Sequence, residues 1–348
     1  MVLHKLEKYY TILSGEHETL PLAEFKSIME AEGVEYQLLS IYPQVLTFTS
    51  NNFNFKVLQR AAMVKEAGIL ITDFECENLE DIIKASMSIE WNQLLKGRTF
   101  LVRFKRIRGS LRNISRSDAE REVGRVIYEN TRCRVNVKSP DVLVRGILVE
   151  HRVLLGIKCL TISSKDFQLR RPRARVYFHP TALNPKLSRL FVNLSRVKKG
   201  DLMLDPFCGT GGILIEAAMI GVNCLGSDVD RDMVKGALLN LRHFSLEPLG
   251  VVRADVTLPP WVRVDAIATD PPYGRASSAK GRPLRKLIFD FLLAHYSIVK
   301  PKRYIVFALP HDINVDDVIP RELYELVEVH RMRVHKSLTR YIVVVRRK

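Results

Sequence analysis

In the second half of the chain, short apolar runs ending in aspartate alternate with longer segments of helical spacing. The aspartates are Asp205, Asp228, Asp255 and Asp270. Alternating strands and helices predict a parallel sheet with crossover helices, and such sheets bind ligands at the carboxyl ends of their strands. Each aspartate alone is equally well explained as a helix N-cap. Four in succession predict one acidic ligand site at a single edge of the sheet.

A glycine-rich loop follows the first of these strands. Three glycines in four residues allow a sharp turn and let a ligand approach the next helix, predicted over 213–220. The Gly-x-Gly-Gly spacing differs from the dinucleotide fingerprint, which argues against a nicotinamide oxidoreductase. An acidic strand end favours a cationic ligand such as S-adenosylmethionine, with Asp228 placed for ribose hydroxyls and Asp255 for the adenine amino group. The predicted cofactor-binding residues here are Asp205, Pro206, Phe207, Cys208, Gly209, Thr210, Gly211, Gly212, Asp228, Val229, Asp255 and Val256.

The strand predicted over 264–268 runs into Asp270-Pro271-Pro272-Tyr273. Two prolines remove two ladder donors and end the strand in a stiff corner. A carboxylate before the corner and an aromatic ring after it suit a flat substrate that carries an amine. The predicted catalytic residues are therefore Asp270, Pro271, Pro272 and Tyr273. The Asp270 carboxylate and the Pro271 carbonyl would orient the amine, and Tyr273 would stack on the base.

The net charge of +16 makes a polyanionic partner the leading expectation, although a merely basic surface is the alternative. Basic residues are concentrated over residues 98–117, which contain no Asp or Glu. More arginines follow in the segment 163–179 and after the proline corner. The predicted RNA-binding residues are Arg103, Lys105, Arg106, Arg108, Arg112, Arg170, Arg171, Arg173, Arg275 and Arg282.

The patterning predicts four consecutive parts. Residues 1–72 read as a ferredoxin-like β-α-β-β-α-β domain whose second helix covers 57–64. Residues 73–162 read as a second α/β unit with helices over 79–95 and from Ser117, in a capping box with Glu120, to about residue 130. Residues 163–179 form an extended basic linker, and 180–348 form the catalytic domain with a closing hairpin over 324–345.

Cysteine spacing and hydropathy limit the remaining possibilities. The five cysteines are widely spaced and include no Cys-x-x-Cys pair, so we expect neither a zinc site nor any other bound metal. No apolar run reaches the length of a membrane span. We expect a cytoplasmic protein, and we favour a monomer while leaving the oligomeric state open.

Two motifs together carry a resemblance to a known family. The loop from Asp205 to Gly212 with Asp270-Pro271-Pro272-Tyr273 resembles those of class I S-adenosylmethionine-dependent amino-methyltransferases. Phe178-His179-Pro180, with Ala182-Leu183-Asn184-Pro185-Lys186-Leu187 after it, is similar to the start of the catalytic domain in archaeal tRNA (guanine-10-N2)-methyltransferases. Residues 73–162 resemble the THUMP domain of RNA-modifying enzymes in their element order and basic loop.

The resemblance implies both a fold and an activity. The fold is α/β: a C-terminal Rossmann-like class I methyltransferase with a seven-stranded sheet and an antiparallel last strand, preceded by a ferredoxin-like plus THUMP region. The implied reaction is S-adenosylmethionine-dependent methylation of the N2 amine of guanosine 10 in tRNA, once or twice. Phe178, His179 and Pro180 would close over the cofactor, and the target base would be flipped into the pocket.

Two alternatives stay open at this point. One is a DNA adenine-N6 or cytosine-N4 methyltransferase, because the same corner suits those amines. The THUMP-like front half and the lack of a recognisable target-recognition insert argue against it. The other is an RNA-binding protein with an inactive methyltransferase domain, which the four retained aspartates disfavour.

Overall fold

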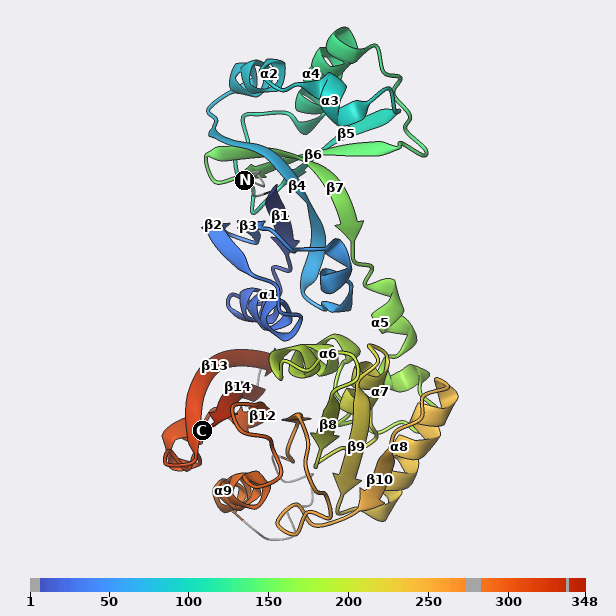
Figure 1. Ribbon diagram of the computed structural model, residues 1–348, viewed down its shortest axis with the longest axis vertical. Helices are drawn as coiled ribbons and strands as arrows, with labels where there is room; N and C mark the ends of the chain where they lie inside the picture. Colours follow the sequence, from blue (N-terminus) through green and yellow to red (C-terminus); the bar gives the residue numbers. More distant parts are fainter. Residues whose placement is uncertain (1–6, 273–282, 336–337) are drawn as a thin grey trace, which may run out of the picture. The chain divides into compact units, whose positions relative to one another are not determined.

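The computed structural model describes residues 7–272, 283–335 and 338–348 (Figure 1). The predicted residues Tyr273, Arg275 and Arg282 lie outside these ranges. The chain divides into two compact units. The first unit comprises residues 1–16, 34–59 and 64–162, and the second comprises 17–33, 60–63 and 163–348. No helix in the described ranges combines the length and apolar character needed to cross a membrane.

The first unit is built on a seven-stranded sheet in the order β2-β3-β1-β4-β7-β6-β5. Its strands are β1 (Glu7–Leu13), β2 (Tyr36–Tyr42), β3 (Val45–Ser50), β4 (Val64–Glu75), β5 (Phe100–Arg106), β6 (Val142–Val149) and β7 (Arg152–Thr161). Helices α2 (Leu79–Met87), α3 (Trp91–Leu95) and α4 (Arg116–Thr131) enclose a core with Phe100 and Val144. Since β4 pairs with both β1 and β7, one sheet runs through the expected boundary at residue 72.

Three local predictions in this part of the chain were wrong. The helix expected over 57–64 is the 3-10 helix η1 (Phe55–Arg60), because the next backbone amides, those of Ala62 and Met63, donate to Glu24 instead of closing helical turns. The single helix over 79–95 is two helices, α2 and α3. Helix α4 is capped by Ser115, whose Oγ accepts from the amide of Asp118. Glu120, assigned to a capping box, accepts from the backbone N–H of Phe104.

The second unit contains the parallel sheet expected from the strand–helix alternation. Its strand order is β10-β9-β8-β11-β12-β14-β13. The strands are β8 (Leu202–Asp205), β9 (Asn223–Asp228), β10 (Gly250–Arg253), β11 (Ala266–Thr269), β12 (Tyr304–Pro310), β13 (Tyr324–His335) and β14 (Leu338–Arg347). The first five in the order are parallel, and β14 is antiparallel to both β12 and β13. The prediction of a seven-stranded sheet with an antiparallel last strand is confirmed.

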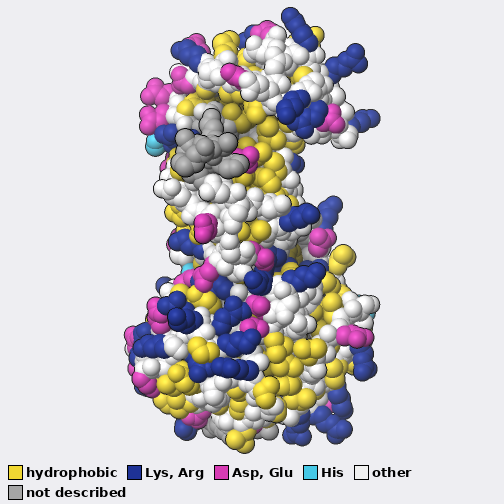
Figure 2. Space-filling model, viewed as in Figure 1, with side chains coloured by type: hydrophobic (Ala, Val, Ile, Leu, Met, Phe, Trp, Pro, Cys, Tyr) yellow, Lys and Arg dark blue, Asp and Glu magenta, His cyan; other side chains and the backbone are white. Residues whose placement is uncertain are grey.

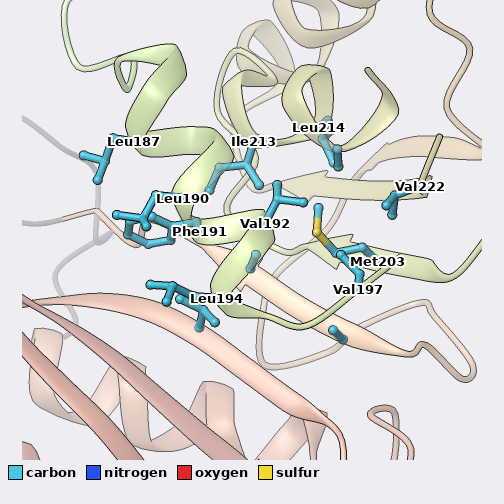
Figure 3. Close-up of a cluster of buried hydrophobic side chains, with 14 of the residues drawn as sticks. Leu187, Leu190, Phe191, Val192, Leu194, Val197, Met203, Ile213, Leu214 and Val222 are labelled. Atoms are coloured by element: carbon cyan, nitrogen blue, oxygen red, sulfur yellow. The ribbon is translucent and has the colours of Figure 1, made fainter. Parts of the chain in front are cut away.

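Helices cover this sheet on both faces. They are α6 (Pro185–Leu194), α7 (Gly212–Ala218), α8 (Arg231–His243) and α9 (Leu284–His295), with the 3-10 helix η3 (Val315–Asp317) before β13. Figure 3 shows α6 placing Leu190 and Phe191 in the same core as Ile213 of α7 and Met203 of β8. The expected extended linker contains short helices, α5 (Lys165–Leu169) and η2 (Pro172–Ala174).

Helix α1 (Leu20–Ala31), although near the start of the chain, packs in the second unit. Its buried Glu24 accepts hydrogen bonds from the amides of Ala62 (2.8 Å) and Met63 (2.7 Å) and from Asn193 Nδ2 of α6 (2.8 Å). Leu20 joins the core cluster that contains α6. Two segments expected in an N-terminal domain, 17–33 and 60–63, thus complete the core beneath the parallel sheet.

Candidate active site

The structure brings the four strand-end aspartates to one edge of the sheet. Strand β8 ends at Asp205 and β9 ends at Asp228, while Asp270 directly follows β11. Asp255 lies two residues beyond β10. Because β10, β9, β8 and β11 are adjacent and parallel, their carboxyl ends lie side by side. The acidic edge is therefore a single surface contributed by four strands.

Asp205 is buried at the centre of this edge, at 1% exposure. Its Oδ1 accepts a hydrogen bond from Thr269 Oγ1 at 2.6 Å and from the amide of Phe207 at 3.3 Å. The pKa of Asp205 is raised to about 8, mainly by burial and also by the carboxylates of Asp228 and Asp270, against the opposing effect of these hydrogen bonds. A cation placed beside this group would favour its ionised form.

Asp228 holds the glycine loop. Its Oδ2 accepts from the amide of Gly209 and its Oδ1 from the amide of Asp230, both at 2.9 Å. Burial raises the pKa of Asp228. Gly209 and Gly211 have φ angles of +49° and +82°, which favour glycine. A β-carbon on Gly209 would meet no atom within 4 Å, so space is open beside the loop. Each carboxylate oxygen of Asp228 keeps acceptor capacity, which fits the hydroxyl pair of a ribose.

The residues predicted after β10, and Val229 after β9, have mainly structural contacts. Asp255 Oδ1 accepts from the amide (2.9 Å) and hydroxyl (2.8 Å) of Thr257, which fixes the turn after the strand. Val256 is buried in the core with Ile267. The carbonyl of Val229 accepts from Arg253 Nε at 3.0 Å. Any role of Val256 in the cofactor site is therefore through its backbone.

A buried asparagine ties the segment before Phe178 to the glycine loop. Asn240 of α8 accepts from the amide of Tyr177 (2.9 Å), and its Nδ2 donates to the carbonyls of Tyr177 (2.9 Å) and Thr210 (3.0 Å). Phe178 is 50% exposed, as suits a side chain that covers a ligand. His179 Nδ1 lies 2.8 Å from Thr181 Oγ1. Asn240 was not predicted, although a fully buried amide within an amphipathic helix is a signal for such a tie.

Asp270 is paired with an arginine that sequence reasoning did not place here. Arg340 of β14 is 3% exposed, and its Nη1 lies 3.1 Å and 3.2 Å from the two carboxylate oxygens of Asp270. Pairing of Arg340 with Pro310 in the β12–β14 ladder positions it at this edge. Pro271 is buried and Pro272 half-buried. The corner is therefore held both by its prolines and by an ion pair.

The basic residues around β5 divide into two groups. Arg108 and Arg112 are exposed, beside the left-handed Gly109 (φ +76°). The others have internal contacts: Arg103 pairs with Glu120 at 3.0 Å, Arg106 donates to the carbonyl of Ile114, and burial lowers the pKa of Lys105. Arg103 also lines a hollow with Arg116 and Arg145. The exposed group remains the better candidate for phosphate contacts.

The linker arginines divide in the same way. Arg171 and Arg173 are exposed, whereas Arg170 pairs with the fully buried Glu216 of α7 at 2.7 Å. Arg170 therefore stabilises the second unit, and we do not propose that it contacts RNA. On the face shown in Figure 2, Lys and Arg side chains are spread over both units, with Asp and Glu side chains among them.

Metal-ion chemistry has no evident centre in the described ranges. They contain no group of three or more His, Cys, Asp or Glu side chains arranged to hold an ion. Independence from metals stays a prediction.

Comparison with known proteins identifies two domains. Residues 172–342 match the family model described as "RMKL-like, methyltransferase domain", and residues 76–158 match the THUMP domain. Among solved structures, TrmN from Thermus thermophilus aligns with a TM-score of 0.58 at 18% identity, covering 98% of this chain and 100% of that one. A methyltransferase complexed with SAH aligns with a TM-score of 0.54 at 15% identity, covering 98% of each chain. These two structures share the fold.

Curated relatives match over nearly the whole chain. A tRNA (guanine(10)-N2)-dimethyltransferase of Methanothermobacter thermautotrophicus is 36% identical over 338 residues, covering 97% of this chain and 98% of the relative. The Methanocaldococcus jannaschii protein of the same name is 31% identical over 360 residues, covering 97% and 99%. Both the THUMP domain and the methyltransferase domain lie within these matches. The chain belongs to the archaeal tRNA (guanine-10-N2)-methyltransferase family of THUMP-containing class I methyltransferases.

Proposed function

We propose that this protein uses S-adenosylmethionine to methylate the exocyclic N2 amine of guanosine 10 in tRNA, giving N2-methyl- and N2,N2-dimethylguanosine. The observation that carries the proposal is the Asp270–Arg340 pair beside the acidic edge formed by Asp205 and Asp228. The position of the target nucleotide, guanosine 10, is proposed from the relatives, which are named for guanine 10.

The residues at the acidic edge fit the proposed cofactor. When bound, S-adenosylmethionine supplies a methyl group on a cationic sulfur. Asp205 and Asp228 supply negative charge and acceptors, and the open space beside Gly209 lets the ligand approach the loop backbone. Asn240 holds the chain before Phe178 against the same loop, which supports the proposal that Phe178, His179 and Pro180 would cover the ligand.

Asp270 orients the amine. The N2 lone pair of guanine is delocalised into the ring, so it must be aimed at the methyl carbon before it can react. The Asp270 carboxylate and the Pro271 carbonyl can each accept one amine hydrogen, which favours a tetrahedral nitrogen of fixed direction. The new bond to N2 would form as the bond between the methyl carbon and the sulfur breaks, and either Asp270 or water would accept the proton that the nitrogen loses. Arg340 fixes the carboxylate during this step.

Basic residues exposed on the protein would hold the tRNA. Arg108 and Arg112 of the THUMP region and Arg171 and Arg173 of the linker are exposed, and they would contact phosphates. Tyr273, Arg275 and Arg282, outside the described residues, keep their proposed roles in stacking and phosphate contact. The target amine is base-paired in folded tRNA, so the base must be flipped out.

We also propose a cytoplasmic monomer that needs no metal ion, as the sequence favours.

Labelled methyl transfer tests the proposal. Unmodified tRNA should accept label from the wild-type protein, and duplex DNA should not. Asp270→Ala should abolish transfer while changing tRNA affinity by no more than a few-fold. Transfer to DNA but not to tRNA would eliminate the proposal in favour of a DNA amino-methyltransferase. No transfer to either would favour an RNA-binding protein with an inactive domain.

A further inference from the structure

Arg175 is a buried arginine with incomplete hydrogen bonding. Its side chain is 5% exposed and lies in the second unit, just before the Tyr177–Pro180 segment. Its Nε donates to the carbonyl of Arg170 at 3.1 Å. Neither Nη1 nor Nη2 has a hydrogen-bond partner in the described part of the chain. Buried guanidinium groups are normally satisfied, so both nitrogens call for an acceptor.

The carboxylate near Arg175, that of Glu216, already binds two other arginines. Glu216 is fully buried, and its two carboxylate oxygens bind Arg170 (2.7 and 3.2 Å) and Arg189 (2.8 Å). Arg170 and Arg189 also donate to backbone carbonyls. One carboxylate therefore faces three guanidinium groups and hydrogen-bonds to two of them. An excess of buried positive charge is costly unless an anion compensates it.

The two nitrogens lie against the glycine loop. A β-carbon built on Gly212 would lie 3.3 Å from Arg175 Nη1, 3.6 Å from Nη2 and 3.3 Å from Ser188 Oγ. Ser188, on α6, is fully buried, and its hydroxyl likewise has no partner in the described ranges. Two donor groups that lack acceptors in the described ranges thus lie together against the backbone of the glycine loop. This arrangement suits a small planar anion.

We propose that Arg175 and Ser188 bind the carboxylate of the amino-acid moiety of S-adenosylmethionine. The proposal rests on the proposed function and deepens it. An arginine fork matches a carboxylate, and charge-assisted bonds of this kind are strong when buried. The site would then have an acidic group, Asp205, at the strand edge and a cationic group at Gly212, as a zwitterionic amino acid requires.

Calorimetric binding of two ligands tests this assignment. S-adenosylmethionine and decarboxylated S-adenosylmethionine differ only in the carboxylate, and both are titrated into wild-type protein, Arg175→Gln and Arg175→Lys. Arg175→Gln should weaken S-adenosylmethionine binding by roughly 10- to 100-fold and change binding of the decarboxylated ligand by only a few-fold. Arg175→Lys should recover part of the affinity. Ser188→Ala should show a smaller loss with the same ligand selectivity.

A matched control separates ligand binding from stability. Arg196 is equally buried at 5% but already pairs with Glu30 and Glu328. Arg196→Gln should lower the melting temperature without changing the ratio of the two affinities. An unchanged ratio in Arg175→Gln would overturn the assignment. If wild-type protein bound neither ligand, the proposed function would fail first, and the assignment with it.

Discussion

Arg340 Nη1 lies 3.1 Å and 3.2 Å from the two carboxylate oxygens of Asp270, 70 residues earlier in the chain. Both side chains are largely buried, at 4% and 15% exposure. An arginine that contacts both oxygens fixes the orientation of the carboxylate. The antiparallel strand β14 thereby takes part in aiming the group that we propose orients the amine.

Replacing Arg340 should slow transfer more than it weakens RNA binding. Arg340→Gln removes the charge but can still donate to Asp270, and we expect kcat to fall roughly 10- to 100-fold, as for loss of a positioned polar group. The KM for tRNA should stay within a few-fold. Arg340→Lys should restore part of kcat. Steady-state kinetics measure both constants. If kcat and tRNA affinity fell together, in proportion to the drop in melting temperature, the role of Arg340 would be purely structural.

The raised pKa of Asp205 predicts a pH-dependent stability. Its ordinary value is 3.8 and its value in the folded protein is about 8. The folded state therefore holds the proton more tightly, and this stabilisation is complete below about pH 4 and lost as pH rises toward 8. The contribution to the slope is about 1.4 kcal/mol per pH unit at most within that window.

Urea unfolding of the ligand-free protein at several pH values measures this slope. Asp205→Asn should flatten it, because the amide oxygen can still accept from Thr269 while no proton is exchanged. Asp232→Asn on α8, where the side chain is 72% exposed, serves as the control and should leave the slope unchanged. Equal slopes in wild-type protein and Asp205→Asn would show that Asp205 is not the source of the pH-dependent stability.

The parallel sheet and its acidic edge could be predicted from the sequence because those features are local. Each strand is a short apolar run, and each aspartate lies at or just beyond its end. The partners of these groups are distant in sequence. Thr269 reaches Asp205 from the adjacent strand, and Arg340 reaches Asp270 from the last strand of the chain. Neither pairing could be inferred without the strand order.

Arginines in the linker were predicted as one group because composition alone does not distinguish a solvated charge from a buried one. Arg170 and Arg175 turned inward, since α7 presents the buried Glu216 beside them, while Arg171 and Arg173 stayed exposed. Helix α1 is the first helix of the β-α-β-β-α-β pattern predicted for residues 1–72. Its place in the second unit depends on Glu24 meeting Ala62, Met63 and Asn193, which is tertiary information.

The exposed arginines of the THUMP region should govern the salt dependence of tRNA binding. Arg108→Ala with Arg112→Ala should weaken binding and lower the slope of log affinity against log salt by about one for each phosphate that is no longer neutralised. Arg170→Ala should lower the melting temperature, because it removes a partner of buried Glu216, and should leave the slope unchanged. Filter binding of tRNA at several salt concentrations measures the slope for each variant. A normal slope in the double variant would remove this loop from the interface.

Glu24 should be important for the stability of the second unit. Glu24→Ala leaves the amides of Ala62 and Met63 without an acceptor and removes one of the two acceptors of Asn193 Nδ2. The expected loss is roughly 2–5 kcal/mol of unfolding free energy, measured by urea denaturation. Glu18→Ala, at an exposed position just before α1, is the control and should cost little. Equal stability of the two variants would mean that α1 contributes little to this unit.

The most direct test of the central claim is nucleoside mass spectrometry of tRNA treated with the protein and S-adenosylmethionine. An unmodified transcript should gain N2-methyl- and N2,N2-dimethylguanosine, located at position 10 by fragment mapping. The same transcript with guanosine 10 replaced by adenosine should gain neither. Methylated guanosine at another position, or equal methylation of the substituted transcript, would contradict the account.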